Sequence, residues 1–344
     1  MGYRKRSLGV GAGLSLCLLG PAAWAAEGAA ACAAEAGDQA RLACYDRLFR
    51  AAPAAPVAPE AGRPATLQPD RAAADGMLTE RWGLGEEADR RLFRIHAHRP
   101  TYILPVRWSN APNHQPTSPN PDNQVASPDS LKAAEAKYQI SFKTLAYSDH
   151  WFGQRADLWL GYTQQSSWQV YDRKNSAPFR ETDYEPEAML VLPLDTSLGR
   201  TGLRLRMAGL GVNHQSNGRA NPYSRSWNRI MGQVGLESDE GDFAVLLRGW
   251  QRMNESADKD DNPDITHYLG HADVQFLWRA GRNGFGVNLR GTPSHAAAKV
   301  DWSYQLHGGL RAYVQLFSGY GESLIDYNHR QTTLGFGISL VDWF

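Results

Sequence analysis

The 344-residue chain has no excess of charge of either sign and almost no long hydrophobic runs. Its 36 Lys and Arg residues balance 36 Asp and Glu residues, which argues against a nucleic-acid-binding protein, since such proteins carry a basic excess. The one long apolar run stands at the start of the chain, so several membrane-spanning helices of about 20 apolar residues each are excluded. Gly-x-Ser-x-Gly, His-Glu-x-x-His and Walker motifs are also absent, so these common catalytic signatures assign no function.

The start of the chain is predicted to be an export signal over residues 1–25. Residues 4–6 are basic, residues 8–19 are apolar, and a small-residue cleavage pattern ends at Ala25. A transmembrane anchor is the alternative, which the shortness of the apolar stretch disfavours.

Cysteine is scarce, with three residues in all, one of which leaves with the signal. Cys32 and Cys44 remain, and in an exported protein they could form a disulfide or stay as two free thiols. A helix is predicted over 38–49. The cysteine pair and an Ala- and Pro-rich linker form a predicted N-terminal extension, residues 26–89, ahead of a main domain at 90–344.

The main domain alternates apolar and polar residues with the period of two that is typical of β-strands. Val300, Trp302 and Tyr304, for example, are separated by Asp301 and Ser303. Twelve such segments are predicted, near 91–107, 135–147, 153–170, 183–194, 200–216, 224–238, 241–253, 266–280, 283–292, 298–307, 309–318 and 330–344.

A soluble β-sandwich would show the same alternation, but three features favour a membrane barrel. Most segments have about 10 residues or more, enough to cross a bilayer at a tilt, and aromatic residues gather near segment ends. The final segment ends in Phe344, which resembles the assembly signal of bacterial outer-membrane barrels. Connections after even-numbered segments are short and those after odd-numbered segments are longer, as in such barrels. The predicted fold class is therefore all-β: a 12-stranded antiparallel transmembrane β-barrel, located in the outer membrane of a Gram-negative bacterium.

One connection, between the fifth and sixth segments, carries residues suited to nucleophilic catalysis. His214 and Ser216 are two apart on a strand and share a face, and a hairpin centred near Asn221 would place Asn228 opposite His214. Each of the three residues lies an even number of positions from the apolar residues of its strand, so their side chains are predicted to face lipid. Burying polar groups there costs free energy, which suggests that they serve a function. His214 could take the Ser216 proton while Asn228 orients the imidazole ring. The alternative is a polar strand end entering a loop.

The chain resembles the outer-membrane phospholipase A family of Gram-negative bacteria over roughly residues 90–344. The resemblance depends on five motifs that follow one another along the chain and that lie on or beside the predicted outer connections. They are Pro178 to Pro186 (PFRETDYEP), Asn213 to Arg219 (NHQSNGR), Ser224 to Arg229 (SRSWNR), Asp260 to Thr266 (DDNPDIT) and Ser318 to Asn328 (SGYGESLIDYN).

The resemblance implies a calcium-dependent phospholipase that hydrolyses acyl esters of phospholipids and lysophospholipids at both the A1 and A2 positions and acts as a homodimer. In this sequence Ser216 matches the nucleophile, His214 the base and Asn228 the orienting residue, and the Gly218 amide matches an oxyanion donor.

The resemblance also implies a calcium ion held between two subunits. Its ligands would be the Arg219 carbonyl, the Ser224 hydroxyl and Ser176 of the partner subunit. A second calcium site of the family uses two Asp residues: Asp261 matches one of them, but Asn221 stands at the other position.

Gln164 lies an even number of positions from the apolar residues Leu158, Leu160 and Tyr162 on one strand, so its side chain is predicted to face lipid with theirs. Near the rim, water could satisfy its amide; deeper in the membrane, the partner would be the same residue of a second barrel across a two-fold interface. Two functions without catalysis remain as alternatives. A porin would need a wide lumen, and an adhesin would need longer outer loops.

Overall fold

The computed structural model describes residues 31–49, 76–85, 88, 90–151 and 153–341. The chain divides into two units, Met1–Gln68 and Pro69–Phe344. The predicted signal at 1–25, the central part of the linker at 51–75 and the terminal Phe344 lie outside the described residues.

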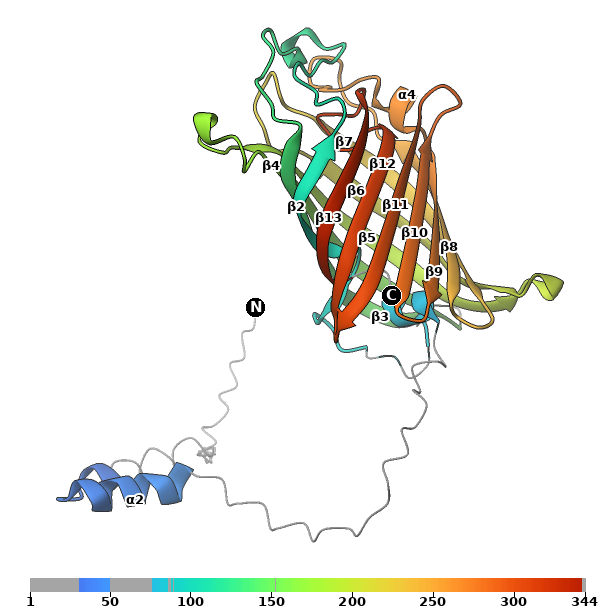
Figure 1. Ribbon diagram of the computed structural model, residues 1–344. Coiled ribbons are helices and arrows are strands. Elements are labelled where there is room, and N and C mark those ends of the chain that lie inside the picture. The colour runs from blue at the N-terminus through green and yellow to red at the C-terminus, as the bar shows by residue number, and fades with distance from the viewer. Residues whose placement is uncertain (1–30, 50–75, 86–87, 89, 152, 342–344) are drawn as a thin grey trace, which may run out of the picture. The chain divides into compact units, whose positions relative to one another are not determined.

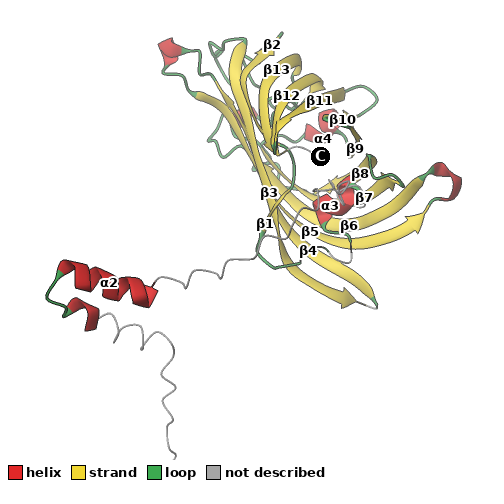
Figure 2. Ribbon diagram, turned by 60° about the horizontal axis from the view of Figure 1, so that its bottom comes forward, coloured by secondary structure: helices red, strands yellow, loops and turns green. Residues whose placement is uncertain are grey.

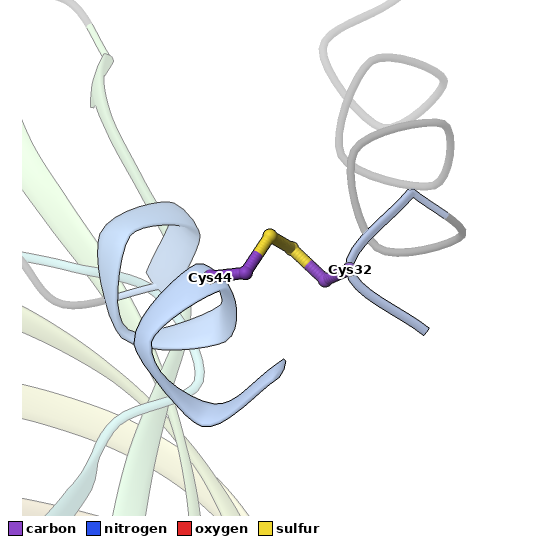
Figure 3. Close-up of a disulfide and its surroundings, with 2 residues drawn as sticks. All are labelled: Cys32 and Cys44. Carbon is purple, nitrogen blue, oxygen red and sulfur yellow. A yellow bond between two sulfur atoms is a disulfide. The ribbon is translucent and has the colours of Figure 1, made fainter. Parts of the chain in front are cut away.

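The first unit contains helix α2 (Asp38–Phe49), which confirms the helix predicted there. A disulfide joins Cys32, which precedes the helix, to Cys44 in its second turn (Figure 3). The pairing settles the choice between a disulfide and two free thiols.

The second unit is built from antiparallel strands that close into a barrel (Figure 1). From β2 to β13 each strand pairs with its neighbours in sequence order, and β13 pairs with β2, so the ring of twelve strands has no free edge. The predicted fold class is confirmed. The strands are β1 (Ile95–Ala97), β2 (Thr101–Ser109), β3 (Ala134–Trp151), β4 (Gln154–Trp168), β5 (Phe179–Ser197), β6 (Leu203–Ser216), β7 (Ser226–Ser238), β8 (Phe243–Arg252), β9 (Ala272–Ala280), β10 (Asn283–Gly291), β11 (Ala296–His307), β12 (Leu310–Tyr320) and β13 (Arg330–Val341).

Two predicted strands differ from the structure. The first is divided into β1 and β2, which both pair with β3; Pro100, which has no amide hydrogen to donate, lies between them. The segment predicted over 266–280 begins instead with the short helix α4 (Ile265–Leu269), and strand β9 starts only at Ala272.

The alternation predicted from the sequence sorts the side chains between the two faces of the barrel wall. The apolar set is exposed on the outward face, with Leu210, Val212 and Ile230 all more than half exposed. The intervening polar residues, such as Asn213 and Arg229, are buried in the interior. This arrangement is the reverse of a soluble sandwich and is that of a membrane barrel.

Charged pairs fill the interior of the barrel. Arg107 binds Glu135 and Glu322 at 2.6 and 2.9 Å, Lys137 binds Glu322 at 2.7 Å, and Arg180 binds Glu135 at 3.0 Å. These side chains leave an interior cavity of about 160 Å³. Such a filled lumen disfavours the porin alternative.

Helix α3 (Met77–Trp82) packs inside the end of the barrel that carries the short connections (Figure 2). No helix among the described residues is both long and apolar enough to cross a membrane. Glu237 on β7 accepts hydrogen bonds from the Leu78 amide at 2.6 Å and the Thr79 hydroxyl at 2.7 Å, so it caps the start of α3. The helix is surrounded by the apolar residues Leu145, Trp159, Met189, Val191, Met207, Ala244 and Leu277.

We expect Glu237→Gln to destabilise the barrel by about 1–2 kcal/mol, because Gln has one acceptor oxygen for the two donors that Glu237 now binds. Urea unfolding in lipid vesicles measures the difference. The exposed Glu240→Gln in the following connection is the matched control and should unfold like the wild type. Equal stability of both variants would show that the cap contributes nothing.

Candidate active site

The hairpin of β6 and β7 brings His214 and Asn228 together at the end of the barrel with the long connections, here called the outer end. The register pairs His214 with Asn228 and Ser216 with Ser226. Asn228 Oδ1 lies 2.8 Å from His214 Nδ1, a hydrogen-bond distance. The amide oxygen can only accept, so the proton of the neutral imidazole sits on Nδ1 and Nε2 has a free lone pair.

The three side chains lie on the outward face of the barrel wall. His214 is exposed, and Ser216 and Asn228 are half-buried, while the adjacent residues Asn213 and Arg229 are buried in the interior. A hydroxyl, an imidazole and an amide are thus held on the lipid side of the strands, near their outer ends. The geometry suits attack of the hydroxyl on an acyl ester whose chains lie in the membrane.

The connection from 216 to 226 is held rigidly by Asn217, whose side chain points inward. Its Nδ2 donates to Glu181 Oε1 at 3.0 Å and to the Tyr223 carbonyl at 2.7 Å, and its Oδ1 accepts from the Arg225 amide at 3.0 Å. Gly218 follows with φ of +63°, and a Cβ there would lie 3.1 Å from the Tyr184 ring. The left-handed backbone and the close ring both favour glycine at this position.

Oxygen donors gather beside the hairpin around Asp261, which lies in the connection after β8. Asp261 Oδ2 accepts from the Ser224 hydroxyl at 2.7 Å and from the Ser226 hydroxyl at 3.2 Å. Asn123 donates to Asp261 Oδ1 at 3.3 Å and to Asn221 Oδ1 at 3.1 Å. Carboxylate, hydroxyl and amide oxygens are the ligands that calcium prefers, so this donor set fits the ion that the resemblance implies.

The other two predicted ligands belong to two different connections. Arg219 follows β6, and its side chain stacks on the Tyr223 ring at 4.1 Å and donates to the Arg180 carbonyl at 2.9 Å. Ser176 is exposed in the connection between β4 and β5, with φ of +61°. In the described part of the chain, no cluster of three or more His, Cys, Asp or Glu side chains could hold a metal ion. A calcium site here would therefore need carbonyl and hydroxyl ligands as well.

Burial and the hydrogen bond that its hydroxyl donates to Asp129 at 2.9 Å raise the pKa of Tyr223. The phenol therefore stays neutral at neutral pH and keeps its place under the Arg219 guanidinium.

Gln164 lies half-buried on the outward face of β4, between Ile140 of β3 and Tyr184 of β5. Its Oε1 accepts from the Tyr162 hydroxyl at 3.1 Å, and its Nε2 lies 3.4 Å from Ser166 Oγ. Residues two positions away on the same strand therefore supply partners for the Gln164 amide within its own chain.

Three residues of the site were not found from the sequence. Asn123, Asn217 and Glu255 all lie in connections, where spacing in the sequence does not predict the direction of a side chain. Glu255 accepts a hydrogen bond from Asn228 Nδ2 at 3.2 Å. Of the three, only Asn217 could have been found from the sequence, because it stands between Ser216 and Gly218 in the NHQSNGR motif.

Comparison with known sequences identifies relatives of this arrangement. A family model described as phospholipase A1 matches residues 78–340. A Neisseria meningitidis serogroup B protein, provisionally named phospholipase A1, is 39% identical over 354 residues, which cover 92% of this chain and 91% of that protein. The phospholipase A1 of Escherichia coli K12 is 37% identical over 212 residues, covering 61% and 71% of the two chains.

Solved structures agree with the sequence relatives. The outer membrane phospholipase A of Escherichia coli superposes with a TM-score of 0.65 at 32% identity, covering 73% of this chain and 95% of that one. A Salmonella typhi outer membrane phospholipase, solved as a dimer with bound calcium, gives a TM-score of 0.66 at 31% identity, covering 79% and 99%.

Proposed function

The chain belongs to the phospholipase A1 family, and from this premise we propose that Ser216, His214 and Asn228 are the catalytic triad of a calcium-dependent phospholipase. The enzyme resides in the outer membrane of a Gram-negative bacterium and acts on phospholipids. Its substrates are proposed to include lysophospholipids, with cleavage at both acyl positions. The observation that carries the proposal is the hydrogen bond between His214 and Asn228 on the outward face, beside Ser216.

The proposed reaction begins when His214 Nε2 takes the proton of the Ser216 hydroxyl as its oxygen attacks the ester carbonyl. The same nitrogen then gives the proton to the departing alcohol, which leaves an acyl group on Ser216. Water, activated by His214, releases the fatty acid and restores the hydroxyl. Asn228 holds the ring through Nδ1–H and keeps Nε2 directed toward the serine.

The negative oxygen of the tetrahedral intermediate needs hydrogen-bond donors or positive charge beside it. We assign the Gly218 amide to this role, since it follows Ser216 by two residues in a connection held by Asn217. Calcium, when bound, would supply positive charge beside this oxygen. Its proposed ligands are the Arg219 carbonyl, the Ser224 hydroxyl and Ser176 of the partner subunit.

Asp261, in the connection after β8, is proposed as a ligand of the second calcium site. Asn123 donates to both Asp261 and Asn221, so the two residues of this site lie close together. The amide of Asn221 is neutral, and a site that pairs it with Asp261 would hold the ion more weakly than one with two carboxylates.

The active enzyme is proposed to be a homodimer that associates through the outward face around Gln164. The surrounding residues are apolar and well exposed: Ile140 is 46% exposed and Leu160 is 43% exposed. A two-fold axis would set this surface against itself and could bring Ser176 of one subunit toward the hairpin of the other.

Gln164→Ala should weaken the dimer by about 0.5–2 kcal/mol, the range for polar contacts between helices in membranes. The hydrogen bonds of Gln164 within its own strand favour the lower end of this range. Analytical ultracentrifugation in detergent, run beside an activity assay, measures both association and hydrolysis. A fully active species that sediments as a monomer would refute the dimer and its shared calcium site.

Hydrolysis of a phospholipid by the purified protein in detergent micelles, with and without calcium, tests the proposed function. The alternative is a non-enzymatic outer-membrane barrel, which would release no fatty acid under either condition. The filled interior already argues against transport through the lumen.

A further inference from the structure

A carboxylate stands behind the proposed triad, on the side of Asn228 away from His214. Asn228 Nδ2 donates to Glu255 Oε1 at 3.2 Å, while Asn228 Oδ1 faces His214 Nδ1 at 2.8 Å. Glu255 lies half-buried in the connection after β8, three residues beyond the end of that strand. The start of this connection is tied to β7, because the Met253 amide donates to the Asn228 carbonyl at 2.8 Å.

The two ends of a side-chain amide have similar shapes and opposite hydrogen-bonding roles. If the amide turned over, its NH₂ group would face His214 and would favour the tautomer with the proton on Nε2. That tautomer cannot accept the serine proton. An ionised carboxylate only accepts hydrogen bonds, so Glu255 selects the NH₂ end of Asn228 and leaves the oxygen for His214.

We propose that Glu255 is a positioning residue of the active site, which fixes the orientation of the Asn228 amide and thereby the tautomer of His214. This inference rests on the proposed function. Glu255 would add a fourth member to the row of Ser216, His214 and Asn228. Its negative charge lies one residue beyond the position that an acidic triad member would occupy.

The test compares Glu255→Gln with Asp258→Asn, a neutralisation of the same loop at an exposed side chain. We expect Glu255→Gln to lower kcat by about 3–10-fold and to leave KM unchanged, because a misdirected Asn228 amide lowers the share of the productive His214 tautomer without touching the substrate. Asp258→Asn should leave both unchanged. Heat-modifiable mobility on gels verifies that each barrel is folded, and an unchanged kcat in folded Glu255→Gln would overturn the inference.

A double-mutant cycle with Asn228→Ala separates positioning from a structural effect of the loop. If Glu255 acts through Asn228, Glu255→Gln should have no further effect on kcat once Asn228 is alanine. Equal effects in both backgrounds would refute the inference while leaving the triad intact. Hydrolysis that survives Ser216→Ala would instead refute the proposed function itself, so the two failures are distinguishable.

Discussion

Ser216→Ala is expected to abolish phospholipid hydrolysis, with kcat lowered by roughly 10⁴-fold or more. The alanine side chain has no oxygen to form the acyl-enzyme, and no other hydroxyl shares the face of His214 at the same spacing on β6. Release of fatty acid from phospholipid in mixed micelles measures the loss. Ser216 is half-buried at the end of a strand, so the substitution should leave the fold and its gel mobility unchanged.

A matched control is Ser318→Ala, which removes an exposed hydroxyl from the outer half of β12 and should retain full activity. His214→Ala should be nearly as damaging as Ser216→Ala, since the general base is lost. Asn228→Ala should leave weak activity, because Asn228 orients the ring without taking part in proton transfer. Activity of Ser216→Ala near that of the wild type would contradict the assignment of the nucleophile.

Removal of calcium by a chelator is expected to lower hydrolysis by about 10²–10³-fold, the effect of losing a major stabilising group for the oxyanion. In the proposed triad Asn228 is neutral and balances the charge of a protonated His214 only weakly, so calcium beside the oxyanion would supply the main electrostatic stabilisation of the transition state. The barrel should stay folded, since hydrogen bonds between neighbouring strands close the whole ring. Fatty-acid release and gel mobility, measured in the same chelated sample, separate the two effects.

The Ser224 and Asp261 oxygens predict how the calcium requirement responds to substitution. Ser224→Ala removes one proposed ligand and should raise the calcium concentration needed for half of full activity, whereas the Ser318→Ala control should not. Equal rates for the wild type in excess calcium and in excess chelator would contradict the metal assignment.

Much of the fold follows from the sequence because the barrel wall has two different faces. Lipid lies outside the wall and charged pairs lie inside it, so apolar and polar residues alternate along each strand. Val212 and Ile230 are exposed on the outward face, whereas Asn213 and Arg229 are buried in the interior. Short elements inside or above the barrel escape this rule. Helix α4 was mistaken for the start of a strand, since five residues are too few to show a helical period.

The residues of the proposed active site that lie on strands could also be predicted from the sequence, whereas those in connections could not. Counting outward from the hairpin turn pairs His214 with Asn228, and the structure has this register. Glu255 and Asn123 reach the site from connections far along the chain, so only folding brings them there. The hydrogen bonds of Gln164 also depend on side-chain rotamers, which parity alone does not determine.

The most direct test of the catalytic assignment is covalent labelling with a long-chain alkyl fluorophosphonate, which reacts with activated serine hydroxyls. The purified protein in calcium-containing micelles would be labelled, digested and analysed by peptide mass spectrometry. The account predicts one adduct, on Ser216, formed in step with the loss of hydrolysis and absent from His214→Ala. An adduct on a different residue that accompanies inactivation, or full hydrolysis by protein labelled on Ser216, would contradict it.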